Sequence, residues 1–499
     1  MKKIIFSFFL LVLIQFSCTK LDDKLYDRIP PDAYTADPVL QMSVIYAPMR
    51  DFLDWGGWWF ANELTGDGAV GPTRDTDWDD GGKWRVLHQH TWNHETEAIN
   101  SMWSRFYNGI VEANRFIEAQ QPFAGDPIVD QAIAKAKVLR AYYYYLAIDN
   151  YGDVPYVIKY LDAEPSPKRN HRAQIFEKIV KEVEESTPYI SFSTSRTGVG
   201  KGAAFSLLTK LYINHAVYTG SVNPAYWAKA EQYADSVIQL GIYSLESDAL
   251  APFVTNNHNS VENIWIIPYN EDSYQGFNLH MRTLHYNHNL TFDMVAGPWN
   301  GFAAMKDHFD TYTDDDRRKE GFLYGPQFTS SGAEIIDGVA NAPLIIDPFI
   351  PALEMTIENN TPQEIRMSGA RVAKFEIKKG AKADLSNAFP VFRYADILLL
   401  KAEALIRQGQ NGDDYVNMIR NRAGIDSWSG VTLEMLLEER GRELFWEAHR
   451  RQDLIRFGQF NKSWWEKPAS TPDRNVFPIP LWAKEANPNL DADIVDINP

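Results

Sequence analysis

Two aromatic-rich stretches hold the side chains of this chain that are best suited to ligand chemistry. The first runs from Trp55 to Asn93 and the second from Tyr269 to Trp299, and both carry Asp, Asn, Gln or Arg beside their rings. A Trp or Tyr ring stacks on a flat ligand, while the polar groups hydrogen-bond its edge. The candidate contacts are Arg74, Asp77, Trp78, Trp92, Asn93, Tyr274 and Trp299. Each ring could equally belong to the core, because pocket and core aromatics share one sequence signature.

An acidic stretch, Asp75–Asp80, begins like a calcium-binding loop. An EF-hand needs glycine at its sixth position and glutamate at its twelfth, where this chain has Asp80 and Val86. A solvated loop is therefore favoured over an irregular cation site. No catalytic residue is assigned, although a hydrolytic pair of carboxylates cannot be recognised from sequence among so many acidic residues.

Two further motifs resemble known sites without meeting their requirements. The pattern of His88, His90 and His94 has no carboxylate partner, so exposed histidines are expected instead of a metal site. The glycines at 198–202 lack the spacing of a phosphate-binding loop, which favours a turn before a helix. The sequence therefore predicts no metal and no cofactor.

Composition sets limits on the partners. The 499 residues include 49 Lys and Arg against 66 Asp and Glu, for a net charge of −17, which argues against nucleic acid and anionic membrane surfaces. Hydrophobic residues make up 45%, as in globular proteins. One cysteine excludes a disulfide framework.

The first residues have the features of a secretory signal. Lys2 and Lys3 precede the apolar segment 4–14, which is too short to span a bilayer. Cys18 follows where a bacterial lipoprotein carries its lipid. We expect a signal peptide at 1–17 and a lipidated Cys18 as the sole membrane attachment, the alternative being ordinary cleavage beside a chance cysteine.

Apolar residues at helical spacing recur through both ends of the body. Turn residues separate these segments, which predicts a mainly α fold built as a tetratricopeptide-like array of helical hairpins. The expected divisions are a scaffold at 18–240, a loop-rich, partly β insertion at 241–392, and C-terminal helices at 393–499 that complete the same unit. A non-repetitive helical domain is the alternative.

Five segments in order resemble the SusD/RagB family of Bacteroidetes outer-membrane nutrient-binding lipoproteins. They are 136–155, 393–404, 417–424, 439–456 and the tail segments within 477–490. Ala448 stands where the family more often has glycine. The acidic residues of 439–456 are expected to form structural ion pairs, with Glu447 reaching Arg450 or Arg451.

The resemblance implies a surface lipoprotein that captures an oligosaccharide or polysaccharide and delivers it to a SusC-type TonB-dependent transporter. It implies that binding aromatics come from the early loop and the mid-chain insertion, where the two aromatic stretches lie. Asp22 and Asp23 resemble the family's export signal to the outer face. Two alternatives stay open: a glycoside hydrolase with an unrecognised carboxylate pair, and a lipoprotein for peptide import.

Overall fold

The structure is a computed structural model that describes residues 37–55 and 57–497. Cys18 and the expected signal peptide lie outside the described residues. The chain divides into two units, Met1–Gln41 and Met42–Pro499. The described part of the first unit contains the short helix α2 (Pro38–Gln41).

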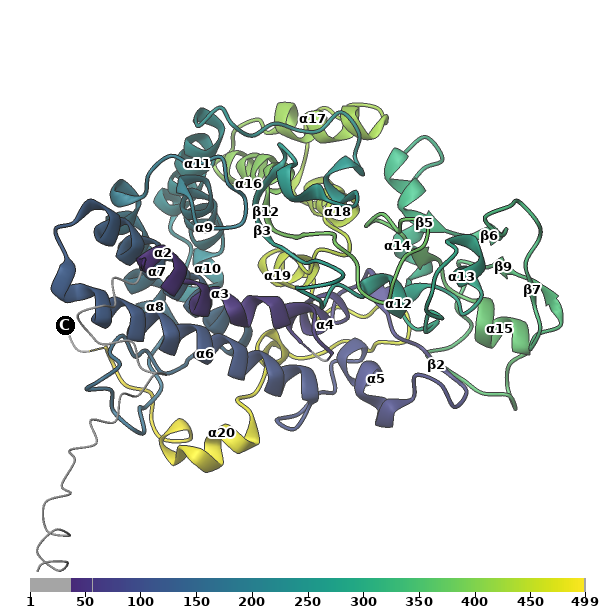
Figure 1. Ribbon diagram of the computed structural model, residues 1–499, viewed down its shortest axis with the longest axis horizontal. Coiled ribbons are helices and arrows are strands. Elements are labelled where there is room, and N and C mark those ends of the chain that lie inside the picture. Colours follow the sequence, from purple (N-terminus) through teal and green to yellow (C-terminus); the bar gives the residue numbers. More distant parts are fainter. Residues whose placement is uncertain (1–36, 56, 498–499) are drawn as a thin grey trace, which may run out of the picture. The chain divides into compact units, whose positions relative to one another are not determined.

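Helices that follow one another along the chain pack side by side in the N-terminal half of this unit. Helix α3 contacts α6, α6 contacts α7, α7 contacts α8, and α9 contacts α11 (Figure 1). The bounds are α3 (Ser43–Arg50), α4 (Trp58–Glu63), α5 (Lys83–His88), α6 (Glu97–Gln120), α7 (Pro127–Tyr151), α8 (Arg172–Ser186), α9 (Lys201–Ile213), α10 (His215–Thr219) and α11 (Pro224–Gln239).

Local sequence signals fix the ends of the long helix α7. Asp126 accepts a hydrogen bond from the Ile128 N–H, and Pro127 occupies the first helical position, where its missing N–H has no cost. Gly152 follows the helix with φ of 75°, a conformation that glycine adopts without strain. The glycines at 198–202 likewise lead into α9, as predicted.

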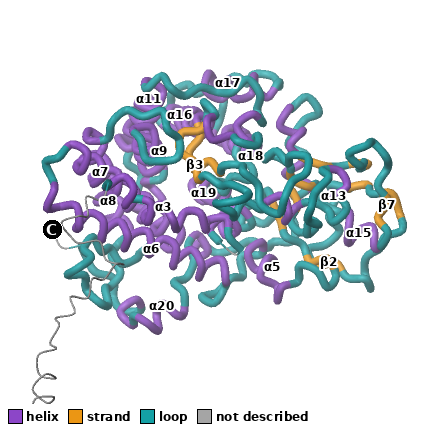
Figure 2. The backbone as a smooth tube through the Cα atoms, in the orientation of Figure 1, coloured by secondary structure: helices purple, strands orange, loops and turns teal. Residues whose placement is uncertain are grey.

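The C-terminal helices complete the array. Helix α16 packs against α11, α17 and α18, so it joins the two ends of the chain in one scaffold. The bounds are α16 (Tyr394–Arg407), α17 (Asp413–Ala423), α18 (Leu433–Glu443), α19 (Arg450–Arg456) and α20 (Leu481–Ala486). The predicted mainly α, tetratricopeptide-like fold is confirmed (Figure 2).

The residues between α11 and α16 form short helices and paired strands joined by loops. The helices are α12 (Leu279–Thr283), α13 (His288–Thr291), α14 (Lys306–Phe309) and α15 (Pro362–Met367). The longest pair, β3 (Asn263–Ile267) and β12 (Phe389–Arg393), is antiparallel and fully buried. The other antiparallel pairs are β5 (Phe322–Leu323) with β11 (Arg371–Val372), β6 (Gly325–Pro326) with β9 (Ile345–Ile346), and β7 (Ile336–Asp337) with β8 (Ala342–Pro343).

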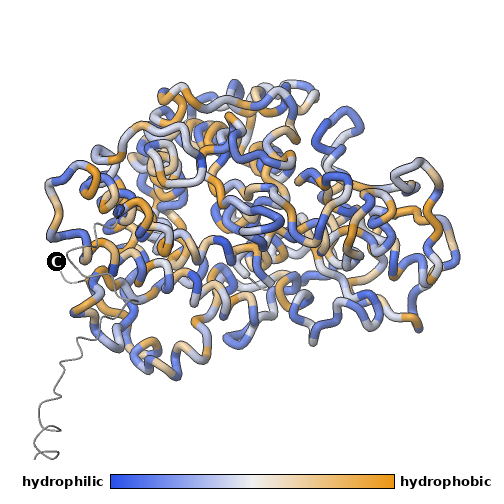
Figure 3. Tube along the Cα trace, viewed as in Figure 1, coloured by the Kyte–Doolittle hydropathy of each residue, from blue (hydrophilic) through white to orange (hydrophobic). Residues whose placement is uncertain are grey.

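Two strand pairs tie the early aromatic stretch to the mid-chain segment. Strand β1 (Ala69–Val70) is antiparallel to β4 (Ala303–Ala304), and β2 (Thr73–Arg74) is parallel to β10 (Glu354–Met355). These ladders bring together stretches that lie more than 200 residues apart. Hydrophobic and hydrophilic residues alternate along the helices (Figure 3), as expected for helices that pack through one face.

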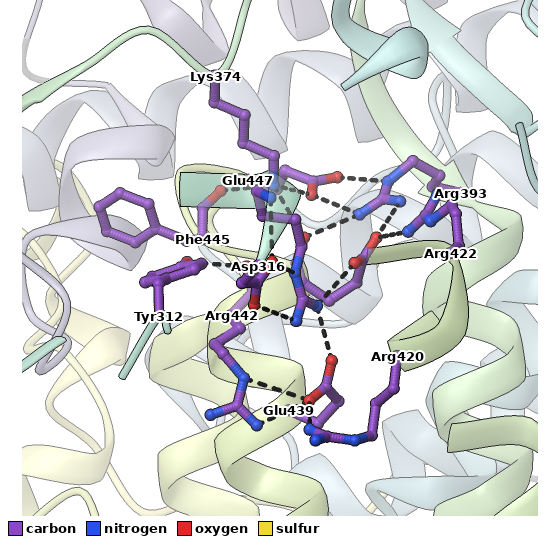
Figure 4. A network of polar contacts seen from close by, with 12 residues as sticks. Tyr312, Asp316, Lys374, Arg393, Arg420, Arg422, Glu439, Arg442, Phe445 and Glu447 are labelled. Atoms are coloured by element: carbon purple, nitrogen blue, oxygen red, sulfur yellow. Dashed lines mark hydrogen bonds and ion pairs between the residues drawn. The ribbon is translucent and has the colours of Figure 1, made fainter. Parts of the chain in front are cut away.

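A buried network of charged side chains crosses the C-terminal helices (Figure 4). The Glu443 carboxylate at the end of α18 pairs with Arg318 (3.1 Å), Arg393 (2.6 Å) and Arg422. Burial alone would raise the pKa of Glu443, but these guanidinium groups hold it well below its usual range. The network links segments at 318, 393, 422 and 443 through charge pairs within the core.

Glu447 also belongs to this network, which corrects one expectation. Its carboxylate pairs with Lys374 (2.7 Å) and Arg393 (2.7 Å), whereas Arg450 pairs with Asp67. The turn after α18 points Glu447 inward, and Ala448 adopts a φ of 61° in that turn. Glycine adopts this left-handed conformation most readily, which explains the residue that the family more often has there.

Candidate functional site

The early acidic loop follows strand β2 and has an unusual backbone. Asp75, Trp78, Asp80, Gly81 and Gly82 all have positive φ values between 43° and 81°. Left-handed backbone is costly for residues other than glycine and persists where the surroundings hold it in place. The surrounding structure therefore holds the backbone of this loop in one defined conformation.

Arg74 holds the start of this loop from inside the protein. Its buried guanidinium donates hydrogen bonds to the backbone carbonyls of Gly301 (3.2 Å), Ile365 (2.8 Å) and Ser368 (3.0 Å). Burial lowers the pKa of Arg74 to about 10. The Arg74 side chain therefore joins the loop to the mid-chain segment, and its contact with a ligand stays a prediction.

Trp78 is the buried anchor of the loop. Its side chain is 6% exposed, and its Nε1–H donates to the Trp299 carbonyl at 2.6 Å. The ring packs on Phe302 and lies against Gly301, where an added Cβ would come within 2.3 Å of it. Trp78 therefore offers no open face for stacking in this structure, and its expected role as a ligand platform stays a prediction.

Trp55 and Trp299 contact this anchor, and Tyr286 is joined to the same loop through Asp77; we call these three half-buried rings the aromatic cluster. The Trp55 and Trp299 ring centroids lie 6.2 Å apart with an interplanar angle of 76°. The Tyr286 hydroxyl donates to the carboxylate of the exposed Asp77, next to Trp78 in the loop. The structure therefore joins aromatic surface from both predicted stretches, with Asp77 at its edge.

Cations lie against two rings of the aromatic cluster. Lys83 Nζ is 4.6 Å from the Trp55 ring centroid, and the Arg366 guanidinium is 4.6 Å from that of Tyr286. Arg366 also donates to the buried carboxylate of Asp337 at 2.8 Å, which fixes its position. Burial and the hydrogen bond to Asp77 raise the pKa of Tyr286 to about 12, so its hydroxyl stays protonated at neutral pH.

The other predicted contacts lie apart from this arrangement or at its margin. Trp92 is 2% exposed and packs on Phe477, with ring centroids 4.8 Å apart, so its ring lies in the core and offers no open face. Asn93 is exposed, but its side chain accepts the Glu95 N–H at the start of a helix. Tyr274 is 57% exposed, with Arg50 at 5.7 Å from its ring.

Trp55 and Tyr286 were part of the two aromatic stretches, but sequence reasoning did not single them out. Trp55 precedes the helix α4, and Tyr286 lies in a loop between α12 and α13. No periodic pattern marks either residue as half-exposed. Their proximity to Trp299 and Asp77 results from the β1–β4 and β2–β10 pairs, which are too short to be recognised in the sequence.

Two sequence motifs, the acidic loop Asp75–Asp80 and the three histidines at 88, 90 and 94, concern possible metal binding. Within residues 37–55 and 57–497, no group of three or more His, Cys, Asp or Glu side chains is arranged to hold a metal ion. His88 and His90 are buried, not exposed as expected: His88 Nε2 contacts the Trp465 carbonyl and His90 stacks on Phe460. Across the same residues, no helix has both the length and the apolar character needed to cross a membrane.

The fold and the sequence together define a class of protein. Residues 351–490 match the family model described as SusD family, and residues 70–213 match the one described as "Starch-binding associating with outer membrane". The chain is therefore similar to SusD-family proteins in two separate stretches, one in each half of the sequence.

Individual relatives support the assignment at low sequence identity. The chain is 24% identical to the starch-binding protein SusD of Bacteroides thetaiotaomicron over 80% of this chain and 79% of that protein. It is 22% identical to SusD-like protein P25 of Formosa agariphila over 79% and 78% of the two chains.

Solved structures show the same fold. A SusD superfamily protein from Parabacteroides distasonis aligns with a TM-score of 0.74 at 20% identity, covering 91% of this chain and 97% of the other. Surface glycan-binding protein A from Bacteroides thetaiotaomicron, solved with laminarihexaose, aligns with a TM-score of 0.72 at 19% identity, covering 90% and 97%.

Proposed function

We propose that this protein is a non-enzymatic, cell-surface glycan-binding lipoprotein that captures an oligosaccharide or polysaccharide at the aromatic cluster. The observation that carries the proposal is the assembly of Trp55, Tyr286 and Trp299 around the Asp77 loop. The C–H face of a pyranose ring stacks on such rings, and its hydroxyl groups hydrogen-bond to carboxylate and guanidinium groups.

Similarity to SusD-family proteins supports this choice of ligand. Relatives are named for binding starch, and one related structure contains laminarihexaose. A ligand held by a few aromatic platforms and polar groups is expected to bind with a Kd between micromolar and millimolar, or about −8 to −4 kcal/mol.

The proposal predicts selective retention of an intact glycan. The purified protein would be run through native gels containing starch, laminarin or other polysaccharides, and the incubated oligosaccharides would then be analysed by chromatography. Retardation by at least one glycan without cleavage supports the proposal. Cleavage would instead identify the glycoside hydrolase alternative, and retention of peptides with no glycan would favour peptide import.

The proposed partner is a SusC-type TonB-dependent transporter, since the described residues contain no membrane-spanning helix of their own. Pull-down of the tagged protein from native membranes should recover a β-barrel transporter. Recovery of the lipoprotein alone in several mild detergents would contradict this partnership.

The proposed anchor is a lipid on Cys18, which would place the protein at the outer membrane facing the exterior. Mass spectrometry of the mature N-terminus should find an acylated Cys18. A free N-terminus at another residue would contradict the anchor while leaving the glycan proposal in place.

A further inference from the structure

A second surface feature lies on the helical scaffold, formed by α7, α8 and the loops beside them. It is a groove of about 540 Å³, lined by residues that include Lys137, Arg140, Tyr156, Ile158, Lys178 and Tyr189. This volume is within the range of ligand-binding clefts. None of these residues belongs to the aromatic cluster, so the groove needs an explanation of its own.

The groove contains a buried ion pair with spare hydrogen-bonding capacity. Arg140 is 4% exposed, pairs with Glu182, and donates to the Asn114 side chain at 2.7 Å. Arg140 Nε and Glu182 Oε2 are both buried and have no hydrogen-bond partner in the described chain. Unsatisfied buried polar atoms are rare in folded proteins and call for a partner. One free donor beside one free acceptor matches the C=O and N–H of a peptide backbone.

The groove is lined by four cationic side chains and three carboxylates, namely Lys137, Arg140, Lys178, Lys181, Asp130, Glu182 and Glu185. Lys137 and Lys178 form no ion pair with any described residue, and Lys181 makes only an exposed contact with Glu185 at 3.6 Å. The two lysines without an ion pair leave the lining with a small excess of positive charge, in a chain whose net charge is −17. Such a site attracts negatively charged ligands, and charge complementarity of this kind selects binding partners.

Apolar side chains stand exposed around the mouth of the groove. Tyr189 is 62% exposed and Ile158 is 46% exposed, and both line it. Phe123 is 64% exposed and directly precedes Ala124, another lining residue. Apolar surface rimmed by polar groups is typical of protein interaction sites. A neutral glycan would use the rings but would leave the lysines unpaired, so a protein partner is the better match.

We propose that this groove binds an extended, acidic segment of a partner protein, with carboxylates on Lys137 and Lys178 and apolar side chains on Tyr189, Ile158 and Phe123. The segment's backbone reaches Arg140 Nε and Glu182 Oε2, which are buried in the structure, when the side chains that cover them move aside. This interaction is separate from glycan capture and does not depend on it.

A phage-displayed library of random dodecapeptides, selected on the purified mature protein, tests the proposal. Enriched peptides are expected to place Asp or Glu next to aromatic or aliphatic residues. Fluorescence anisotropy with a synthetic copy should show affinity that falls with added NaCl, as for a charge-assisted contact. The Lys137→Glu/Lys178→Glu variant should bind at least tenfold more weakly.

A matched variant controls for the change in net charge. Lys229→Glu/Lys462→Glu alters the charge by the same amount outside the groove and should keep the peptide affinity within twofold. Failure to enrich any peptide, or equal binding by the two double variants, would overturn the proposal. Loss of glycan retention in the Lys137→Glu/Lys178→Glu variant would also overturn it, because the groove would then be a glycan site.

Discussion

At the scale of single residues, burial separates the aromatics that can contact a ligand from those that cannot. Trp55, Tyr286 and Trp299 keep part of their rings accessible, whereas Trp78 and Trp92 are enclosed. Both groups come from glycine-rich stretches with the same composition. The difference arises from long-range packing, such as Gly301 against Trp78 and Phe477 against Trp92, which no local pattern encodes.

Trp92 provides a test of this division. Trp92→Ala removes a core ring and should lower the free energy of unfolding by about 3–5 kcal/mol, with glycan affinity unchanged in the folded fraction. Urea unfolding and titration calorimetry on the same sample measure the two effects. Trp482→Ala, at an exposed position on α20, should change stability by less than about 0.5 kcal/mol. A stable Trp92→Ala protein that no longer binds glycan would contradict the assignment.

At the scale of elements, the 75–82 loop depends on close contact between Trp78 and the mid-chain segment. Gly301→Ala would place a Cβ within 2.3 Å of the Trp78 ring, so the ring and the loop must shift. We expect a loss of about 1–3 kcal/mol in stability, typical of overpacking, together with weaker glycan binding. Both are measurable by thermal unfolding and titration.

Gly297 offers a matched control four residues away. An added Cβ there meets nothing within 4 Å, so Gly297→Ala should behave like the wild type. If Gly301→Ala leaves both stability and affinity unchanged, Trp78 does not hold the loop in the manner described.

The buried charge network makes a prediction about helix α18. Glu443→Gln removes the carboxylate that faces Arg318, Arg393 and Arg422, which leaves buried positive charge uncompensated. Breaking such a pair is expected to lower stability by about 3–5 kcal/mol. Glu438→Gln, on the same helix, removes a half-exposed partner of Arg442 and should cost no more than about 1 kcal/mol. Equal denaturation midpoints for the two variants would contradict a structural role for the network.

The helices were predictable because their apolar residues repeat at helical spacing and turn residues separate them. The stripe at Ile175, Phe176, Ile179, Val180 and Val183 is buried in α8 as predicted. Strands of two residues, such as β1 and β2, are too short to show the alternation of apolar and polar residues by which a strand is recognised. Each of these strands pairs with a partner more than 200 residues away in the sequence. The sequence therefore indicated which stretches contribute to the site, but not which residues within them come together.

At the scale of the whole molecule, buried histidines make stability depend on pH. Burial lowers the pKa of one group of histidines to about 4, namely His88, His280, His285 and His449. It lowers the pKa of another group to about 3, namely His90, His288 and His308. These residues bind protons in the unfolded chain from about pH 6.5 downward but stay neutral in the folded protein.

Folding stability should therefore fall as the pH drops from about 6.5 to about 4. Glu63 acts in the opposite sense, because burial raises its pKa to about 7. The stability that its protonated carboxyl group contributes is lost as the pH rises from 4.5 to 7. Because these histidines outnumber Glu63, they determine how folding stability changes with pH over this range. Urea midpoints at pH 7.5, 6 and 5 measure it, and a midpoint that rises towards pH 5 would contradict the neutral, buried state of these histidines.

The central claim is that the aromatic cluster binds glycan, and Trp299→Ala tests it most directly. Trp299 is half-buried, and alanine keeps the backbone carbonyl that accepts from Trp78, so the fold should be retained. Stacking contributes about 0.5–1.5 kcal/mol, which corresponds to a loss of affinity of several-fold to about tenfold. Titration calorimetry, with the glycan that the protein retains, should show this loss for Trp299→Ala and wild-type affinity for Trp482→Ala. Wild-type affinity in a folded Trp299→Ala protein would contradict the account.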